Sequence, residues 1–367
     1  MGWTTKAVIL AGGYATRLRP ISYVIPKLLF PVLGKPMIYW TFDLLKKFGV
    51  DEVVLCVNYL ANLLQEKIGS SYQSMKITYS PENEPLGTAG PLRLAAQTVR
   101  LNQTFLAMNG DILAEVPLSK MLNSHENANA LVTDALHEVE NPSRFGVAEL
   151  LPDGRIRKFI EKPSPGETSS RLINAGIYLI EPEILDMITL GKKVSLEKQI
   201  FPTLTKRGRL AGFPFAGLWF DIGNFEDYSK ANFTLLQNCR AKSVDKDSVL
   251  RRRSKVADLV YVGEDSKIGQ NVTLGTLTVI GRNCVVERNS RVSKSVLFDG
   301  VSVGEESLIS GAILASNVKL GKRVTINPGC ILSPNVTIGD DVKVGRGVMI
   351  HPYKEITANL KSNAHVM

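Results

Sequence analysis

The most constraining feature of this chain is an aliphatic residue that returns at every sixth position through its last third. The first run starts at Val262, and glycine follows four of its six aliphatic positions. After slips around Val296 and Ala312, the spacing resumes at Leu314 and continues to Ile356. A β-sandwich would show alternation with a period of two, so the period of six predicts short strands stacked as coils around one aliphatic column.

A second apolar position recurs within the same six-residue units. Together the two positions form the hexapeptide pattern of a left-handed parallel β-helix, which we expect over residues 257–367. Stacked coils leave an open end that needs a cap or a partner, so we also expect a homo-oligomer held by this domain. The second position is occupied by Val272, Cys284, Val324, Cys330, Val336, Val342 and Val348.

Ahead of the repeats, short apolar strands alternate with stretches of helical periodicity. Lys6–Leu10 is typical of a buried strand, Pro36–Phe48 of a helix that stops at Gly49, and 52–57 of the next strand. Such alternation predicts βαβ units, here an α/β domain with a Rossmann-like, mostly parallel mixed sheet. We expect this domain over residues 1–238 and a polar linker over 239–256. We also expect strands over 129–137 and 146–151, and ligands at the carboxyl ends of the parallel strands.

The balance of charges narrows the class of partner. Lys and Arg number 44 against 35 Asp and Glu, a net charge of +9. No recognisable nucleic-acid module or basic tail accompanies this excess, and Arg251–Arg253 is typical of a solvated linker. We therefore expect anionic small-molecule substrates, no nucleic acid and no membrane partner. The four cysteines form no Cys-x-x-Cys pair, and no segment has signal-peptide character, which predicts reduced thiols in the cytoplasm.

A glycine pair and two arginines follow the first strand directly. Gly12 and Gly13 allow backbone N–H groups to crowd around a phosphate without a Cβ in the way. Arg17 and Arg19 add positive charge with a fork geometry suited to phosphate oxygens. The spacing matches neither the Walker nor the Rossmann pattern. The stretch therefore predicts a phosphate-binding loop of another kind.

Two aspartates follow strands elsewhere in this domain. Asp111 comes after the strand 104–108, and Asp221 ends the run Trp219-Phe-Asp. Taken by themselves they are either solvated turn residues or metal ligands, and the residues alone leave this open.

The loop residues resemble the signature of the sugar-1-phosphate nucleotidyltransferases, Gly-Gly-x-Gly-Thr-Arg-Leu-x-Pro followed by Pro-Lys. Here it reads Gly12–Pro20 and then Pro26-Lys27, with Ala15 in place of the third glycine. Ala15 is tolerated if its φ is negative and strained if it is positive. The resemblance covers nearly the whole chain. Within the family, Glu84–Pro91 and the β-helix look closest to the mannose-1-phosphate guanylyltransferases.

This resemblance implies a reaction and a set of residues. The reaction is nucleotidyl transfer from a nucleoside triphosphate to a sugar 1-phosphate, most closely GTP with mannose 1-phosphate to give GDP-mannose and pyrophosphate. Arg17 and Lys27 are the implied catalytic residues, and Asp111 and Asp221 the implied ligands of Mg²⁺. The implied nucleotide-binding residues are Leu10, Ala11, Gly12, Gly13, Thr16, Glu82, Gly87 and Thr88, and those for the sugar phosphate are Asn109, Gly146, Glu161, Lys162 and Asn174.

Two glutamates precede the Gly87-Thr88 turn, where the family reads its base. Guanine presents adjacent N1–H and N2–H₂ donors, and one carboxylate can accept from both. Glu82 or Glu84 could therefore select guanine, and the alternative is that both are solvated loop residues.

Other functions remain open at this point. Glucose-1-phosphate thymidylyl-, uridylyl- and adenylyltransferases share these motifs, and a catalytically inactive paralogue could sense a nucleotide-sugar. An acyltransferase activity of the β-helix would usually need a histidine base. The repeats contain only His351, with His365 in the tail, so we expect no such activity.

Overall fold

The computed structural model describes residues 5–238, 243–244, 249–250 and 253–367, so most of the predicted linker 239–256 and the pair Arg251-Arg252 lie outside the described residues. Two compact units make up the chain. The first joins Met1–Tyr14 to Ile38–Asp221, and the second joins Ala15–Met37 to Ile222–Met367. The domain bounds at 238 and 256 stay a prediction.

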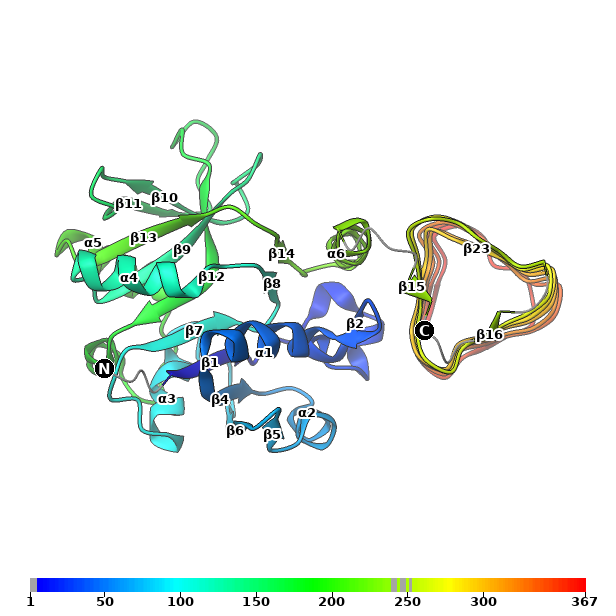
Figure 1. Cartoon of the computed structure of the whole chain (residues 1–367), viewed down its shortest axis with the longest axis horizontal. Helices are drawn as coiled ribbons and strands as arrows, with labels where there is room; N and C mark the ends of the chain where they lie inside the picture. The colour runs from blue at the N-terminus through cyan, green and yellow to red at the C-terminus, as the bar shows by residue number, and fades with distance from the viewer. Residues whose placement is uncertain (1–4, 239–242, 245–248, 251–252) are drawn as a thin grey trace. The chain divides into compact units, whose positions relative to one another are not determined.

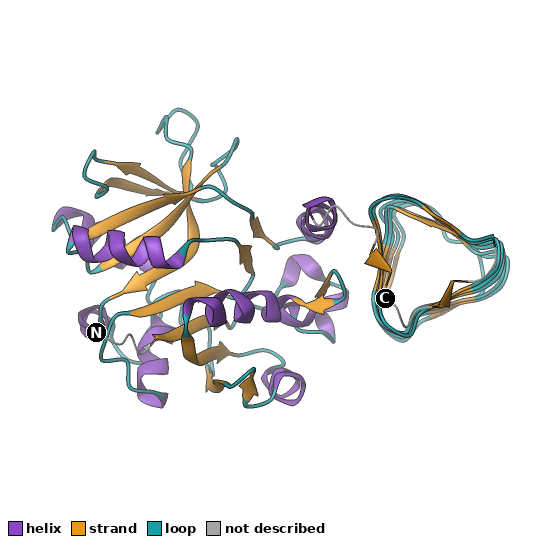
Figure 2. Ribbon diagram, in the orientation of Figure 1, coloured by secondary structure: helices purple, strands orange, loops and turns teal. Residues whose placement is uncertain are grey.

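A mixed sheet forms the centre of the first unit, in the order β11-β10-β12-β7-β1-β4-β6-β5, with β9 also paired to β12 and β13 paired to β9. The run β7-β1-β4-β6 is parallel, as predicted, and β12 is antiparallel to both β7 and β9. Helices flank this sheet (Figures 1 and 2). The strands are β1 Thr5–Ala11, β4 Val50–Val57, β5 Ser71–Tyr72, β6 Met75–Pro81, β7 Phe105–Asn109, β9 Val132–Glu138, β10 Gly146–Leu150, β11 Ile156–Glu161, β12 Leu172–Ile180 and β13 Leu210–Phe215.

The remaining elements of this unit are helices and one small ladder. The ladder pairs β8 Ile112–Ala114 with β14 Trp219–Asp221. The helices are α1 Met37–Phe48, α2 Ala61–Ile68, α3 Gly90–Thr98, α4 Leu118–Ala128 and α5 Phe201–Lys206, with a 3₁₀ segment η4 Pro182–Met187 and a π-helical turn η5 Leu196–Ile200.

The sequence patterns find these elements to within a few residues. Helix α1 buries Met37, Ile38, Phe42 and Leu45 at helical spacing, and Gly49 follows it at φ 90°. One predicted boundary is wrong. The strand expected from residue 129 begins at Val132, because Asn129 takes a left-handed φ of 47° and caps α4 instead.

The second unit contains the predicted left-handed parallel β-helix, whose coils are triangular in cross-section (Figure 1). Its first sheet is β15 Ser243–Val244, β18 Val260–Val262, β21 Thr278–Ile280, β24 Val296–Leu297, β27 Ile313–Leu314, β30 Ile331–Leu332, β33 Met349–Ile350 and β35 His365–Val366. The second is β16 Val249–Leu250, β19 Lys267–Ile268, β22 Val285–Val286, β25 Ser302–Val303, β28 Lys319–Leu320, β31 Thr337–Ile338 and β34 Glu355–Ile356. The third is β17 Lys255–Val256, β20 Thr273–Leu274, β23 Arg291–Ser293, β26 Leu308–Ser310, β29 Thr325–Ile326 and β32 Lys343–Val344.

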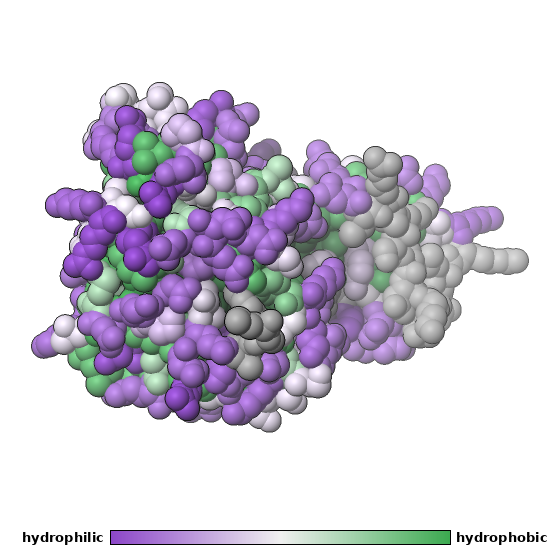
Figure 3. Space-filling model, turned by 60° about the vertical axis from the view of Figure 1, so that its left-hand side comes forward, coloured by the Kyte–Doolittle hydropathy of each residue, from purple (hydrophilic) through white to green (hydrophobic). Residues whose placement is uncertain are grey.

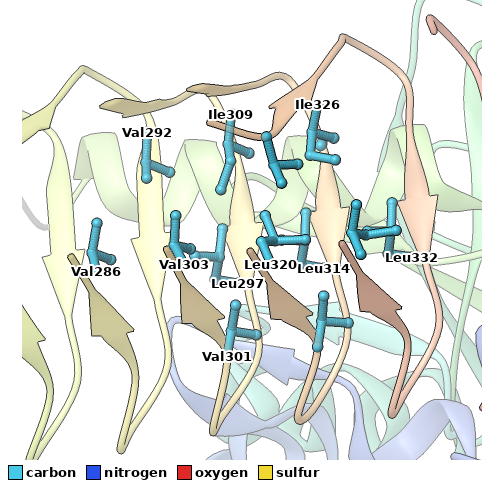
Figure 4. Packing of buried hydrophobic residues seen from close by; sticks show 14 of the residues in the cluster. Val286, Val292, Leu297, Val301, Val303, Ile309, Leu314, Leu320, Ile326 and Leu332 are labelled. Carbon is cyan, nitrogen blue, oxygen red and sulfur yellow. The ribbon is translucent and has the colours of Figure 1, made fainter. Parts of the chain in front are cut away.

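The aliphatic column of the repeats is the core of this coil. Val292, Ile309 and Ile326 form one row of side chains that point into the interior (Figure 4), and each is fully buried. The slips in the sequence are also real. Val262 pairs with Ile280, whereas the next step pairs Ile280 with Leu297, so that coil is one residue shorter. The following step, Leu297 to Leu314, is equally short.

The rest of the second unit is a helix and an extended segment. Helix α6 spans Phe225–Asn238. The segment Ala15–Met37, which we call the signature arm, consists of the 3₁₀ turns η1 Thr16–Leu18, η2 Ile21–Tyr23 and η3 Lys27–Leu29 and the hairpin β2 Pro31–Val32 with β3 Lys35–Pro36. It buries Leu18, Ile21 and Phe30 and leaves Arg17 and Arg19 exposed.

The face of the molecule shown in Figure 3 is mostly polar. Hydrophilic side chains dominate the face shown in Figure 3 and are interrupted by smaller hydrophobic areas. Among the described residues, none of the helices combines the length and the apolar character needed to cross a bilayer.

Candidate active site

The glycine pair lies at the carboxyl end of β1, where the sequence placed it. A Cβ added to Gly12 would lie 2.5 Å from Glu82 Oε1, whereas one added to Gly13 would have no described heavy atom within 4 Å. The Leu10 carbonyl accepts a hydrogen bond from Gly110 N at 2.9 Å, which ties the loop to the end of β7. The two glycines therefore differ. Gly12 allows close packing on Glu82, and Gly13 leaves open space.

The two candidate base readers also differ. Glu82 follows β6 and is only 6% exposed, while Glu84 is exposed. Burial raises the pKa of Glu82, against a hydrogen bond that its Oε2 accepts from Leu86 N at 3.1 Å. Of the pair, only Glu82 is a buried carboxylate that can face a ligand in a fixed position.

The turn after these glutamates is fixed by contacts within the protein. Gly87 has a φ of 80°, which favours glycine, and its Cα faces the Val194 carbonyl. Thr88 Oγ1 donates to Glu197 Oε2 at 2.7 Å and accepts from Leu196 N at 2.8 Å. The Thr88 hydroxyl is thus engaged with η5, and the binding of a nucleotide by Thr88 stays a prediction.

The β8–β14 ladder brings together the backbone segments that carry the two predicted metal ligands. Asp221, the last residue of β14, pairs with Ile112, which directly follows Asp111. Both aspartates are half-buried. Within the described ranges, no group of three or more His, Cys, Asp or Glu is placed to hold a metal ion. Two carboxylates fit a Mg²⁺ ion whose other ligands are water and substrate oxygens.

The predicted sugar-phosphate residues gather at the neighbouring end of the sheet. Gly146 and Glu161 are register partners in the β10–β11 ladder, and a Cβ on Gly146 would lie 2.9 Å from Glu161 Oε2. Burial raises the pKa of Glu161, and the charge of Glu197 raises it further, while Lys162 opposes both. Lys162 itself is exposed.

Asn109 and Asn174 meet at an irregularity of β12. Between Asn174 and Tyr178 the pairing with β9 shifts, and Gly176 takes a φ of 73° there. Asn174 Oδ1 accepts from Gly176 N at 2.8 Å. On the other side, a Cβ on Gly176 would lie 2.6 Å from Asn109 Nδ2. A side chain at position 176 would therefore displace Asn109.

Glu197 is a functional candidate that sequence reasoning missed. It lies in the π-helical turn η5 and accepts hydrogen bonds from Thr88 and from Ser195 Oγ at 2.6 Å. It also raises the pKa values of Glu161 and Tyr178, although burial is the larger cause for both. Its partner Thr88 lies far away in the sequence, and the only local signal is Ser195, which caps the turn.

An aromatic wall was also missed. The Trp219 indole donates from Nε1 to the Ala175 carbonyl at 3.0 Å. Its ring lies edge-on to Phe145 at 5.5 Å and is stacked on His137 at 5.6 Å. Because Phe145 precedes Gly146 and Ala175 follows Asn174, this wall borders the predicted sugar residues.

The two predicted catalytic cations belong to the signature arm. Ala15 adopts φ 45° and ψ 43°, the left-handed conformation that glycine takes without cost, at about 1–2 kcal/mol for alanine. Ser22 Oγ donates to the Ala15 carbonyl at 2.8 Å and holds this bend. A Cβ added to Gly223 would lie 2.8 Å from Arg17 Nη2, so the guanidinium rests against the Gly223 backbone. Lys27 opens η3 and is half-buried.

Two family models account for most of the chain. Residues 6–238 match the model described as "Nucleotidyl transferase", and residues 241–344 match "EIF2B subunit epsilon LbH domain", which agrees with the observed coil.

Curated relatives extend over both domains. "Probable mannose-1-phosphate guanylyltransferase 3" of Oryza sativa subsp. japonica is 35% identical over 327 residues, covering 86% of this chain and 88% of its own. "Mannose-1-phosphate guanylyltransferase 1" of Arabidopsis thaliana is 36% identical over 322 residues with the same coverage. "Mannose-1-phosphate guanylyltransferase catalytic subunit beta" of Danio rerio is 34% identical and covers 87% of this chain and 88% of its own.

Solved structures match the first part of the chain. A putative glucose-1-phosphate thymidylyltransferase from Bacillus anthracis superposes with a TM-score of 0.57 and 28% identity, covering 62% of this chain and 94% of its own. HddC from Yersinia pseudotuberculosis, complexed with GMP-PN, gives 0.54 and 29%, covering 63% and 99%. With the glycine loop, the aspartate pair and these similarities in agreement, the chain belongs to the nucleotidyl transferase family.

Proposed function

We propose that this protein is a sugar-1-phosphate nucleotidyltransferase that makes GDP-mannose from GTP and mannose 1-phosphate. The observation that carries the proposal is the buried Glu82 beside the phosphate-binding glycines, in a chain whose relatives are named mannose-1-phosphate guanylyltransferases. A carboxylate so placed suits guanine, because it can accept from both N1–H and N2–H₂. Bases without these donors would leave its buried charge unpaired.

The reaction needs no general base. An oxygen of the sugar phosphate is already anionic and attacks the α-phosphorus of the triphosphate. The new P–O bond forms as the bond to the bridging oxygen breaks, and pyrophosphate leaves with the electron pair. Catalysis is then positioning and charge neutralisation.

The residues divide this work. Arg17 neutralises charge on the departing pyrophosphate and Lys27 on the α-phosphate. Asp111 and Asp221 would hold Mg²⁺, which supplies further positive charge to the phosphate oxygens when bound. The nucleotide is held by Leu10, Ala11, Gly12, Gly13, Thr16, Glu82, Gly87 and Thr88, and the sugar phosphate by Asn109, Gly146, Glu161, Lys162 and Asn174.

The deciding experiment is a substrate panel. GTP, ATP, UTP and dTTP are each assayed with mannose 1-phosphate and with glucose 1-phosphate, and pyrophosphate release is measured. We expect GTP with mannose 1-phosphate to be the best pair. Preference for another base would overturn the guanine assignment and leave the reaction class in place. No release with any pair would favour the alternative of a nucleotide-sugar sensor.

A matched pair of variants tests how the base is read. Glu82→Gln keeps the size of the buried side chain and removes one acceptor, so GTP should lose its advantage over ATP. Glu84→Gln, on an exposed side chain two residues away, is the control and should keep the wild-type preference. Equal effects of the two substitutions would remove Glu82 from base recognition.

We also propose a cytoplasmic homo-oligomer assembled through the β-helix. Cys56, Cys284 and Cys330 are free, buried thiols, as suits a reducing compartment, and burial raises the pKa of Cys284 to about 12. The fourth cysteine, Cys239, lies outside the described residues. Light scattering of the full-length protein tests the assembly, and a monomeric mass would refute it.

A further inference from the structure

The signature arm lies against a column of side chains on the outside of the β-helix. This column, which we call the Phe298 column, consists of Phe298, Ala315, Ser333 and His351. Each member follows a core residue of the first β-helix sheet, and the backbone ladder stacks them on successive coils, with Phe298 N donating to Leu314 O and Ala315 N to Leu332 O at 2.8 Å. Phe298, Ala315 and Ser333 are at most 1% exposed although they point away from the core.

The end of the arm meets the coil that begins with β18, and it also meets helix α6. Gly34 lies on the Tyr261 ring, and a Cβ there would be 2.6 Å from Tyr261 Oη. Leu33 N donates to Asn232 Oδ1 of α6 at 3.0 Å. The Tyr228 hydroxyl donates to the Pro31 carbonyl. These contacts fix the hairpin of the arm on β18 and α6.

The middle of the arm inserts one aromatic ring. Phe30 is fully buried, with its centroid 5.7 Å from Tyr228 and 5.8 Å from Phe298, edge-on to both. Tyr228 and Phe298 are themselves 6.0 Å apart. Three mutually packed rings hold the chain just three residues after Lys27.

The beginning of the arm reaches a distant coil. Tyr23 packs on the His351 ring at 5.4 Å, with an interplanar angle of 36°. The Arg19 guanidinium lies over the same Tyr23 ring, 4.9 Å from its centroid. An arginine of the phosphate-binding signature is thus supported by an aromatic ring that the β-helix supports in turn.

The order of these contacts gives the path of the arm. Residues 23, 30 and 34 meet His351, Phe298 and Tyr261, so the arm runs along the coil axis opposite to the direction in which coils are added. Neighbouring coils are about 4.8 Å apart, and β18 and β33 are five steps apart in their sheet, a distance of about 24 Å. One continuous segment is therefore held at both ends and in the middle by a rigid coil.

We propose that Phe298 and His351 are positioning residues for nucleotidyl transfer, which set the arm that carries Arg17, Arg19 and Lys27. The proposal rests on the proposed function, because that function gives Arg17 and Lys27 a role in the reaction. Neither residue touches a substrate in this proposal. They act by holding the arm in one arrangement, so their loss lowers kcat more than it raises KM.

The test uses His351, which is only half-buried, so that its replacement does not empty the core. His351→Ala removes the ring under Tyr23, and His351→Phe keeps one. We expect His351→Ala to lower kcat about three- to tenfold and to change KM less than about twofold. This factor in kcat corresponds to the interaction energy of one aromatic pair. His351→Phe should restore kcat. Phe298→Leu should lower kcat in the same way, because leucine fills part of the space without the edge-on rings.

A second readout does not depend on activity. Amide hydrogen exchange is followed at Tyr23, Val24 and Phe30, whose N–H groups bond within the short turns of the arm. Exchange there should accelerate in His351→Ala and return to the wild-type rate in His351→Phe. Tyr353→Ala is the matched control: it removes an aromatic ring, 71% exposed, from the same coil, and should change neither exchange nor kcat.

The outcomes separate the two proposals. Wild-type exchange in the arm of His351→Ala would overturn the positioning role whether or not the enzyme is active. So would a variant that changes only the melting temperature and keeps kcat. A wild-type protein inactive with every substrate pair would instead refute the proposed function, while the exchange data would still decide whether the column holds the arm.

Discussion

Replacing Gly223 with alanine should impair the function of Arg17 although Arg17 itself is not mutated. The new Cβ would lie 2.8 Å from Arg17 Nη2 and 3.1 Å from Cζ, whereas carbon contacts normally lie at about 3.5–4.0 Å. Gly223 has no left-handed φ, so its backbone accepts alanine, and the flexible guanidinium must move by about 1 Å. The melting temperature should stay the same or rise slightly, since alanine restricts the unfolded chain.

The magnitude follows from the cost of misplacing a preorganised charge. A shift of about 1 Å in a catalytic group can cost about 100-fold, or about 2.7 kcal/mol of transition-state stabilisation. Removing the charge entirely in Arg17→Ala should cost about 2–4 kcal/mol. We therefore expect Gly223→Ala to lower kcat by up to about 100-fold and to leave KM for the triphosphate nearly unchanged.

A double-mutant cycle measured by pyrophosphate release checks the route of this effect. If alanine at 223 acts through Arg17, it should add almost nothing to Arg17→Ala. Gly339→Ala, whose Cβ would have ordinary contacts in the β-helix, is the control for an added methyl group. If Gly223→Ala costs as much in the Arg17→Ala background as in the wild type, the reasoning fails.

Three further predictions concern the first unit. Asp111→Asn or Asp221→Asn should remove most Mg²⁺-dependent turnover while circular dichroism shows an intact fold; near-normal activity of either variant would refute the shared metal site. Gly13→Ala should leave the melting temperature unchanged, because nothing lies within 4 Å of the new Cβ, yet raise KM for the triphosphate; an unchanged KM would place the phosphates elsewhere. The pKa of Glu181 is raised by burial but lowered more by hydrogen bonds, including one from His125, and the net direction is down from 4.5. Its contribution to stability is therefore fully present above pH 4.5 and is lost as the pH falls below 4.5 through the lowered pKa of the folded state. The stability difference between wild type and Glu181→Gln in urea unfolding should therefore shrink as the pH falls below 4.5, and a constant difference would contradict this.

The repeats made the inward-facing positions of the β-helix predictable residue by residue. Each six-residue unit supplies its own inward side chain, so the positions from Val262 to Ile356 carry the same information in every coil. Even the shortened coils are visible as slips around Val296 and Ala312. The strand expected from residue 129 could not be placed as well. Asn129 forms the left-handed cap of α4 instead of pairing in the strand, and no periodicity in the sequence marks this change.

Local motifs predicted where several candidate site residues lie in the fold, while their roles stay a prediction. Gly12 and Gly13 fall at a strand end, and the β8–β14 ladder brings the segments of Asp111 and Asp221 together. The bond between Thr88 and Glu197 could not be found in this way, since 109 residues separate them and neither has a spacing rule.

The path of the arm was equally hidden. Phe30 and Phe298 look like ordinary apolar residues of two domains, and their contact exists only in the folded chain. Long-range packing of this kind obeys no local period.

Because the arm runs along the coil axis, it fixes the number of coils between the residues that it contacts. Solenoids ordinarily gain or lose whole coils with ease, because each coil contacts only its neighbours. Here Tyr23 and Phe30 are seven residues apart in one segment, and their partners His351 and Phe298 are three coils apart. One duplicated coil between those partners would carry His351 about 4.8 Å beyond the reach of Tyr23. Coils beyond His351 are free of this constraint. Changes in the length of the solenoid can therefore accumulate at that end, but not between the coils that the arm contacts.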